Sequence, residues 1–488
     1  MIADPPPKKS GFAGDVMKLA SGTVFAQMIS LLTAPVIARL YAPEAFGILA
    51  LLTSITGIIG VIACMRYELA IMLPKNDEEA ANLLGLSLSA VFIVTLVSAL
   101  LLWLGQRPLL NWLNAPYMAH YLWIIPLSIF IGGIFAALNY WNSRTRHFGR
   151  LSIARIISSL TTAPLTIAFG LAGFATPGVM IGTGIAGQCL ATAVLGGQIW
   201  KDDRKMLLKV VRWYRMKEGL FRYKKFPLMT TWSAFMNNLS SNLPALMLTA
   251  FFTSSVVGYF SLGQRLLTIP MSLIGGAVAQ VFFQRTATAR YDGTLPIVVG
   301  KTFMRLVAIG FFPLIIVMIS GQDLFIVIFG NQWSNAGIYA QILAPWIMFQ
   351  FISSPLSTLF SVLEIQEIGL VFNVILLITR IAALTIGGLM GSVLTALILF
   401  SASGTLLYLC LCLIILKKSG VIMSMIAKDT LKISLIIIIA LLPVSIFKTI
   451  GSQPMIILVT GCLCLPLYYS ALCCFDEELQ RLLAGLMG

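Results

Sequence analysis

The sequence predicts an all-α, polytopic membrane protein of about 14 transmembrane helices, arranged as two six-helix lobes and a C-terminal helix pair. Hydrophobic residues make up 58% of the 488 residues and charged residues only 10%, and the mean hydropathy is +0.93. Apolar runs long enough to cross a membrane recur from one end of the chain to the other. Soluble domains do not have this composition.

Each apolar run has about 20 residues, which as a helix crosses a hydrocarbon core of about 30 Å. The first run is longer than the apolar part of a signal peptide and lacks a cleavage site, so we expect it to be retained. The predicted spans lie near 19–40, 46–65, 84–104, 121–140, 153–173, 178–199, 229–252, 256–283, 303–321, 339–360, 368–388, 391–415, 431–449 and 454–474.

The distribution of Lys and Arg predicts the orientation of these spans. With the N-terminus in the cytoplasm, 28 of the 33 basic residues fall in cytoplasmic tails and loops, three fall outside and two fall inside spans. Cytoplasmic loops carry this excess of positive charge in membrane proteins. We therefore expect a multi-pass protein of the cytoplasmic (inner) membrane with both termini in the cytoplasm.

The densest basic loop lies between residues 201 and 225 and explains much of the net charge of +15. Because the basic residues follow loops on one side of the membrane, they do not indicate nucleic-acid binding. Within this loop they alternate with Leu, Val, Trp213 and Tyr214. This pattern is typical of an amphipathic helix on anionic headgroups, and a solvated linker is the alternative.

The same loop divides the spans into six before it and eight after it. An even number in the first set gives both sets the same starting orientation, which permits a parallel repeat. Gln27 and Pro35 in span 1 have counterparts in the amides and Pro244 of span 7. We expect an N-terminal lobe at 1–205, the basic loop and a C-terminal lobe at 206–420, and the extra span pair with a cytoplasmic tail at 421–488.

Charged residues within the spans are few and positive. The stretch from Gly258 to Gln284 is interpreted as one spanning helix that carries Gln264 and Arg265 about a third of the way along. Arg380 lies inside the eleventh predicted span, and none of the 18 acidic residues lies at the middle of a span. An intramembrane arginine costs about 2.5–3.5 kcal/mol on insertion scales and commonly marks a substrate path.

A positively charged cavity favours an anionic substrate, because a planar guanidinium binds carboxylate or diphosphate oxygens in pairs. Neutral amides on several spans suit the hydroxyl groups of a sugar, although each amide alone is more often an interhelical contact. A structural arginine, satisfied by neighbouring carbonyls, is the alternative for Arg265. The candidate substrate-binding residues are Arg265, Arg380, Gln264, Gln27, Asn237, Asn238, Asn242 and Asn373.

The eight cysteines and two histidines predict no metal site, cofactor or catalytic pair. The cysteines lie in or beside apolar segments, without His or acidic neighbours at ligand spacing, where Cys behaves as a small hydrophobic residue. The longest predicted outer loop, 105–120, contains Arg107 but no acidic residue. The sequence therefore does not favour an enzyme.

Three stretches carry a resemblance to a known family. SGTVFAQMISLLTAPVIARLYAPEAFGILALLTSI, LGQRLLTIPMSLIGGAVAQVFF and LFIVIFGNQWSNAGIYAQILAPW resemble the first, eighth and tenth span regions of polysaccharide-export flippases. These proteins belong to the multidrug/oligosaccharidyl-lipid/polysaccharide flippase superfamily. The likeness covers nearly the whole chain in span count and order.

The resemblance implies a two-lobed transporter that works by alternating access. Its cargo would be a polyprenyl-diphosphate-linked oligosaccharide for O-antigen, capsule or exopolysaccharide synthesis, with membrane lipids and possible polymerase and chain-length-regulator partners. In the related flippase of the peptidoglycan precursor, an Ala-Asp-Arg-Leu pattern before a proline carries an essential cavity arginine. Arg265 and Pro270 match that pattern here, whereas Gly263 and Gln264 depart from it.

Two other functions remain open. A multidrug or cation antiporter of the same fold is the first alternative, and it is disfavoured because such exporters need a buried carboxylate. A membrane polysaccharide polymerase is the second and weaker one. The sequence does not name the oligosaccharide, the coupling ion or energy source, or the oligomeric state.

Overall fold

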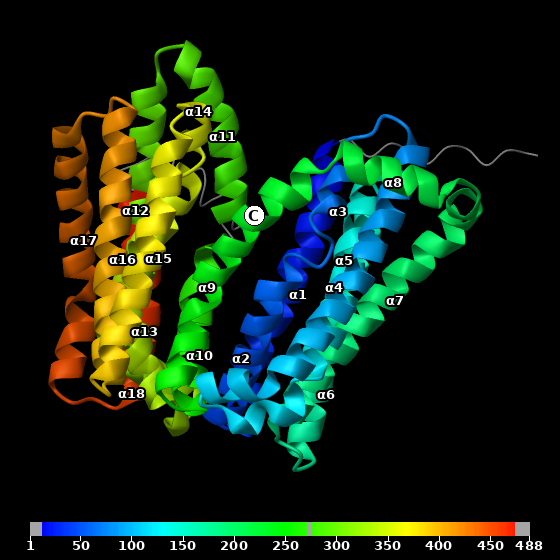
Figure 1. The fold of residues 1–488 in the computed structure, drawn as a ribbon. Helices are drawn as coiled ribbons and strands as arrows, with labels where there is room; N and C mark the ends of the chain where they lie inside the picture. The colour runs from blue at the N-terminus through cyan, green and yellow to red at the C-terminus, as the bar shows by residue number, and fades with distance from the viewer. Residues whose placement is uncertain (1–11, 272–274, 474–488) are drawn as a thin grey trace, which may run out of the picture. The chain divides into compact units, whose positions relative to one another are not determined.

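The structure is a computed structural model that describes residues 12–271 and 275–473, and these residues form helices without a β-strand. The chain divides into two compact units, Met1–Ala250 and Phe251–Gly488. Each unit is a helical bundle with its own apolar core (Figure 1). The predicted all-α, polytopic class is confirmed.

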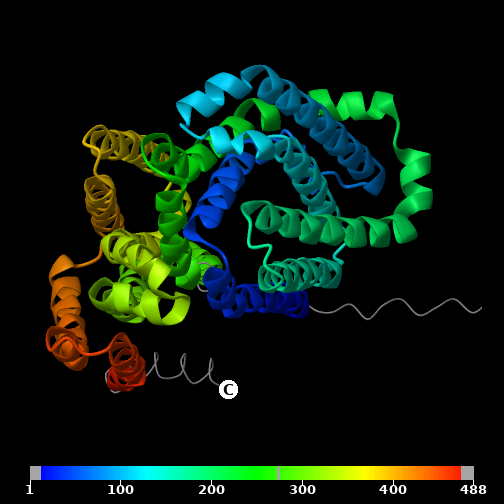
Figure 2. The same cartoon turned by 90° about the horizontal axis from the view of Figure 1, so that it is seen from below.

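The first unit is built around two sets of long helices. α6 packs against α1 and α7, and α5 packs against α2, α4 and α7 (Figure 2). The elements are α1 (Phe12–Leu40), α2 (Pro43–Gly60), α3 (Tyr67–Ala70), α4 (Asp77–Trp112), η1 (Pro116–Tyr121), α5 (Ile124–Arg144), α6 (Phe148–Leu171), α7 (Pro177–Val210), α8 (Trp213–Arg222), the short π-helix η2 (Phe226–Thr230) and α9 (Thr231–Phe251).

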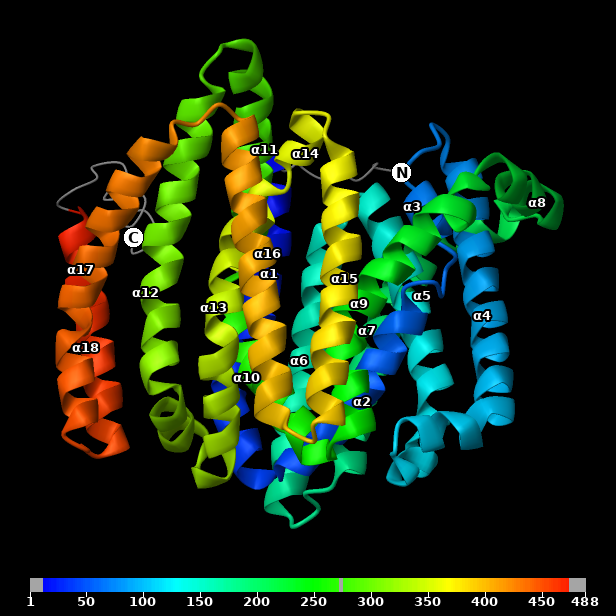
Figure 3. The ribbon, with the colours of Figure 1, turned by 60° about the vertical axis from the view of Figure 1, so that its left-hand side comes forward.

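The second unit is centred on α13, which packs against α10, α11, α12 and α16. α17 and α18 lie side by side next to α12 and form the predicted C-terminal helix pair (Figure 3). The elements are α10 (Ser254–Pro270), α11 (Gly276–Tyr291), α12 (Leu295–Phe329), η4 (Asn331–Trp333), α13 (Ser334–Leu356), α14 (Leu359–Val362), α15 (Gln366–Leu389), α16 (Val393–Lys418), α17 (Met423–Thr449) and α18 (Pro454–Cys473).

Twelve helices in the described part of the chain are long and apolar enough to cross a membrane. The predicted spans at 229–252 and 256–283 are not among them. Polar side chains lower the hydropathy of α9, and the second stretch includes residues 272–274, which lie outside the described part. Pro270 ends α10 and Gly276 begins α11. Met271 and Gly275, on either side of residues 272–274, have helical backbone angles, and a single spanning helix from Gly258 to Gln284 stays a prediction.

Ion pairs in each unit agree with the predicted sides of the membrane. Arg144 contacts Asp77 at 3.0 Å and Arg290 contacts Glu364 at 3.1 Å, and all four residues were assigned to one side. Lys448 contacts Asp323 at 3.5 Å, and both were assigned to the other side. Within each unit, the predicted sidedness is therefore consistent with the contacts.

The boundary between the two compact units in the sequence does not coincide with the predicted lobe boundary. The compact units separate after Ala250, so the basic loop and α9 both belong to the first unit. The loop itself is largely helical, because α7 continues to Val210 and α8 follows two residues later. The repeat-based lobe boundary near residue 206 stays a prediction.

Glycines allow some helices to approach each other at backbone distance. A Cβ atom on Gly387 of α15 would lie 2.3 Å from Cα and 2.4 Å from N of Ala396 in α16. A Cβ atom on Gly197 of α7 would meet no heavy atom within 4 Å. The two glycines therefore differ in what a methyl group would encounter.

We predict that Gly387→Ala lowers the thermal stability of the protein, because the backbone of α16 would have to move away. Gly197→Ala serves as the matched control, and it should leave stability unchanged or raise it by about 0.5–1 kcal/mol, the ordinary gain of alanine over glycine in a helix. The thermal midpoint in detergent, followed by size-exclusion chromatography, measures both effects. Equal midpoints for the two variants would contradict the close helix contact.

Candidate functional site

Helix α10 packs one face against α13 and presents Arg265 on the other. Phe260, Gly263 and Leu267 recur at three- and four-residue intervals and are buried. A Cβ atom on Gly263 would lie 3.1 Å from the carbonyl oxygen of Ala336, so α10 lies close to the backbone of α13. Arg265 follows Gly263 by two residues, about 200° around the helix, and its side chain is exposed.

The turn after Arg265 is held by a hydroxyl group. Thr268 donates to the carbonyl oxygens of Gln264 at 3.0 Å and Arg265 at 3.1 Å. Gln264 itself is half-buried, between the packed face and the exposed face. The pair of adjacent residues thus places an amide and a guanidinium at the same level of α10.

Arg380 on α15 has the opposite environment. Its side chain is buried, with a relative exposure of 6%. The guanidinium carbon lies 5.5 Å from the ring centroid of Trp346 and 5.6 Å from that of Phe400. Cation–π attraction over these rings stabilises a positive charge in an apolar interior. Arg380 is therefore covered by aromatic faces, whereas Arg265 is not.

A glycine makes room for this aromatic arrangement. A Cβ atom on Gly404 would lie 2.6 Å from Cδ1 of Trp346, so any side chain there would displace the indole ring. Trp346 also packs edge-on against Phe400 at a centroid distance of 5.0 Å. The two rings are thereby fixed relative to each other. Asn373, two turns before Arg380 on α15, is exposed.

The amides of α9 belong to the first unit. Asn238 donates to the carbonyl oxygen of Ala234 at 3.1 Å, and Asn242 donates to that of Asn238 at 2.9 Å. Both side chains are half-buried, whereas Asn237 is exposed. These bonds occupy an amide N–H of each side chain and leave its carbonyl oxygen as an acceptor. Gln27 on α1 is half-buried in the same unit.

The structure thus assigns the candidate residues to two groups. Gln27 and the three asparagines lie in the first unit, and Gln264, Arg265, Asn373 and Arg380 lie in the second. Within the second unit, the exposed Arg265 and the buried Arg380 do not share an environment. Their role in substrate binding stays a prediction.

Sequence reasoning missed a cavity in the first unit. It has a volume of about 480 Å³ and lies between α2, α5 and α7. A Cβ atom on Gly60, Gly132 or Gly184 would meet no heavy atom within 4 Å, so these positions open into free space. The lining also includes Thr53, Thr56, Ser128 and Gln188. The glycines that cluster in α2, α5 and α7 were the sequence signal from which this cavity could have been predicted.

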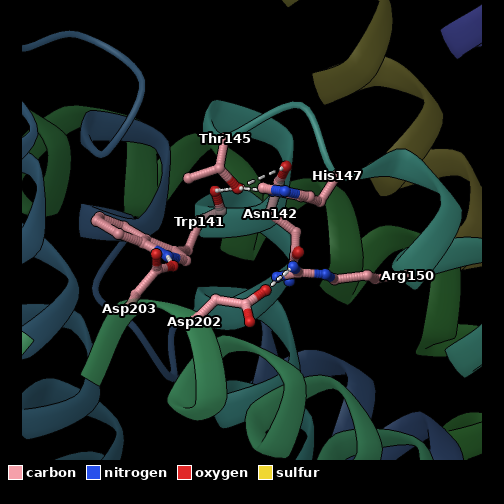
Figure 4. A network of polar contacts seen from close by, with 7 residues as sticks. All are labelled: Trp141, Asn142, Thr145, His147, Arg150, Asp202 and Asp203. Carbon is pink, nitrogen blue, oxygen red and sulfur yellow. Dashed lines mark hydrogen bonds and ion pairs between the residues drawn. The ribbon is translucent and has the colours of Figure 1, made fainter. Parts of the chain in front are cut away.

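Two neighbouring acidic side chains of α7 have partners on α5 and α6. Trp141 of α5 donates from Nε1 to Asp203 at 2.8 Å, and Arg150 of α6 pairs with Asp202. Figure 4 shows how these contacts join the last turn of α5 and the first turn of α6 to the C-terminal third of α7. Both acids thus have a partner on a neighbouring helix of the bundle.

Glu68 is the most buried of the described carboxylates in this unit, with 4% exposure. It lies between the spans, 3.5 Å from Arg66, and its Oε2 atom has no hydrogen-bond partner. Burial raises the pKa of Glu68, and Arg66 opposes this shift. This carboxyl was assigned to the inner end of span 2 and lies in α3, after the end of α2.

Solved structures with the same fold include two classes of membrane transporter. A lipid II flippase, MurJ in an inward closed conformation, aligns with a TM-score of 0.70 at 15% identity, over 93% of this chain and 99% of that one. A multidrug resistance MATE transporter in an inward-facing conformation aligns with a TM-score of 0.61 at 15% identity, over 83% and 99% of the two chains. The TM-scores show a shared fold, and at 15% identity they show the fold alone.

Sequence comparisons point to polysaccharide synthesis. The chain is 25% identical over 235 residues to the teichuronic acid biosynthesis protein TuaB of Bacillus subtilis (strain 168), a match over 45% of this chain and 44% of that protein. The chain thus spans less than half of the length of this relative. A family model described as "Polysaccharide biosynthesis protein" matches residues 36–337. That match includes more than half of the sequence, and the chain therefore belongs to the polysaccharide biosynthesis protein family.

Proposed function

We propose that the protein is a flippase that moves a polyprenyl-diphosphate-linked oligosaccharide from the cytoplasmic to the outer leaflet by alternating access. Such cargo serves the synthesis of O-antigen, capsule or exopolysaccharide. The family match, the fold shared with a lipid II flippase and the name of the TuaB relative support a lipid-linked substrate. The exposed Arg265 carries the proposal.

Arg265 suits the diphosphate of this cargo. Its guanidinium is exposed on a helix whose other face is fixed against α13. A planar guanidinium can bind two phosphate oxygens at once, and such charge-assisted bonds are stronger than neutral ones. A mobile anion can therefore offset the cost of the cation in an apolar surrounding. We assign Arg265 the diphosphate contact, with Gln264 beside it.

Arg380 has a different part in this proposal. The aromatic rings that cover it keep a permanent positive charge inside the second unit. In a medium of low dielectric constant, that charge acts over a longer distance than it would in water. We therefore propose that Arg380 attracts the anion and binds it directly only after the rings separate. The sugar contacts are assigned to Gln27, Asn237, Asn238, Asn242 and Asn373.

The proposed location rests on the distribution of basic residues along the sequence. We propose that the protein lies in the cytoplasmic membrane with both termini in the cytoplasm, because the basic loops then lie on the inner side. A membrane potential that is negative inside favours outward movement of an anion, by about 2.3 kcal/mol per charge per 100 mV. A polysaccharide polymerase and a chain-length regulator are the partners that would use the product.

We predict that Arg265→Ala abolishes surface polysaccharide in a complementation assay, while the protein remains present in the membrane. The loss of two charge-assisted bonds corresponds to about 2 kcal/mol or more, a factor of about 30 in transport rate. Arg265→Lys keeps the charge but loses the planar fork, so it should retain partial activity.

Lys301→Ala, at an exposed position near the start of α12, is the control and should keep normal activity. Normal surface polysaccharide in Arg265→Ala would refute the role of this residue. If a deletion strain instead lost efflux of organic cations and accumulated no lipid-linked sugar, the cation antiporter would be the better function.

We predict that Arg380→Ala, unlike Arg265→Ala, destabilises the folded protein. It removes a desolvated cation–π contact worth about 2 kcal/mol and leaves Trp346 and Phe400 facing an empty space. Arg265→Ala removes an exposed side chain and should leave the thermal midpoint unchanged. Thermal melts of both purified variants measure the two midpoints. An unchanged midpoint for Arg380→Ala would show that the aromatic contact does not stabilise the protein.

A further inference from the structure

Helix α8 packs one face against α4. Met216 and Gly219 on this face are buried. A Cβ atom on Gly219 would lie 3.1 Å from Cδ2 of Leu83, and one on Gly85 would lie 3.4 Å from the sulfur of Met216. The helix therefore lies directly on α4, across its end (Figure 1).

Polar contacts fix the orientation of α8. The side-chain oxygen of Asn82 accepts from the backbone N–H of Arg212 at 2.8 Å, and its amide donates to the carbonyl oxygen of Val210 at 3.2 Å. Arg215 pairs with Glu78 at 2.9 Å and Arg222 pairs with Glu79 at 2.8 Å. Both acids belong to the first turn of α4. The helix is thus held at its start and along one flank.

The other flank carries three aromatic side chains and one leucine, with one lysine among them. We call this set the aromatic stripe. It consists of Trp213, Tyr214, Lys217, Leu220 and Phe221, at helical spacing that places them on one side. Trp213 is 75% exposed and Phe221 is 59% exposed. Arg215 donates to the hydroxyl of Tyr214 at 3.0 Å, and the described part of the chain leaves all four apolar side chains of the stripe exposed.

The position of the aromatic stripe around the axis of α8 decides which surroundings its side chains can contact. With 3.6 residues per turn, Leu220 and Trp213 lie about 40° and 60° from Met216 around the helix axis. Met216 faces α4, and α7 ends only two residues before α8 begins. Trp213 and Leu220 therefore lie beside the face that contacts α4, on the opposite flank of α8 from Arg215 and Arg222.

Positive charge surrounds this stripe. Exposed basic side chains precede it on α7 and follow it before α9, namely Lys205, Lys209, Lys224 and Lys225, in addition to Lys217 within it. Trp and Tyr favour the boundary between headgroups and acyl chains, and Lys adds attraction to anionic lipids. The combination matches a lipid surface better than the uncharged centre of a protein interface.

We propose that the aromatic stripe of α8 binds the surface of the membrane, with its rings among the headgroups of anionic phospholipids. The membrane surface thereby holds the first unit at a fixed depth through α8, Asn82 and the two ion pairs with α4. This inference does not depend on which substrate the protein moves.

Hydrogen–deuterium exchange of the full-length protein in nanodiscs tests the proposal. Segment 211–225 should exchange several-fold more slowly in nanodiscs that contain phosphatidylglycerol than in nanodiscs of phosphatidylcholine alone. Lys217→Gln should reduce this difference by about fivefold, the effect of one cation near an anionic surface. Trp213→Gln combined with Phe221→Gln should speed exchange in both lipids.

Two substitutions elsewhere are matched controls: Tyr291→Gln, an aromatic residue that is 89% exposed at the end of α11, and Lys301→Gln. Neither should alter exchange in segment 211–225. Equal exchange of the unmodified protein in both lipids would overturn the proposal. So would a photo-crosslinker at Phe221 that labels the second unit or another protein instead of lipid, a readout that does not require the glutamine variants to fold.

Discussion

The cost of placing a charge in an apolar medium governs much of this structure. An arginine inside a membrane needs a partner, and the described spans offer no carboxylate at their middle. The second unit has two solutions to this problem. The rings of Trp346 and Phe400 cover Arg380, and Gly404 makes room for the indole. Arg265 is instead turned away from the packed face of α10 and stays exposed. One cation is thus covered within the fold, and the other stays exposed.

Glycine has a different function at each of these positions. Gly263 brings α10 close to the backbone of α13, which turns Arg265 outward. Gly387 brings α15 and α16 together, and Gly404 accepts a tryptophan ring. By contrast, Gly60, Gly132 and Gly184 open into a cavity. Helices in a membrane gain little from the hydrophobic effect between them, so close backbone approach supplies van der Waals contact instead. Glycine therefore permits close contact between helices at some positions and leaves room for a cavity at others.

Much of the fold could be predicted from the sequence, because the length of an apolar run and the charge of a loop can be read from neighbouring residues alone. These two signals predict the all-α class and the C-terminal helix pair, and they place Lys448 and Asp323, which lie 3.5 Å apart, on the same side. The low hydropathy of α9, which carries three asparagines, was not weighed against its length when it was predicted as a span. The surroundings of Arg380 could not be predicted. Its rings lie 34 residues before it and 20 residues after it, so their contact depends on how three helices pack.

The contrast between the two arginines also limits how a transport cycle could operate in this chain. A guanidinium that two rings hold cannot release and rebind a substrate without a rearrangement of α13, α15 and α16. An exposed guanidinium on the free face of α10 needs no such change, because Gly263 and Leu267 keep the opposite face in place. The residue that meets the cargo is therefore expected to lie on a rigid support, while the buried charge contributes a constant field. Under the proposed function, this division gives substrate specificity to Arg265 and a stabilising contact to Arg380.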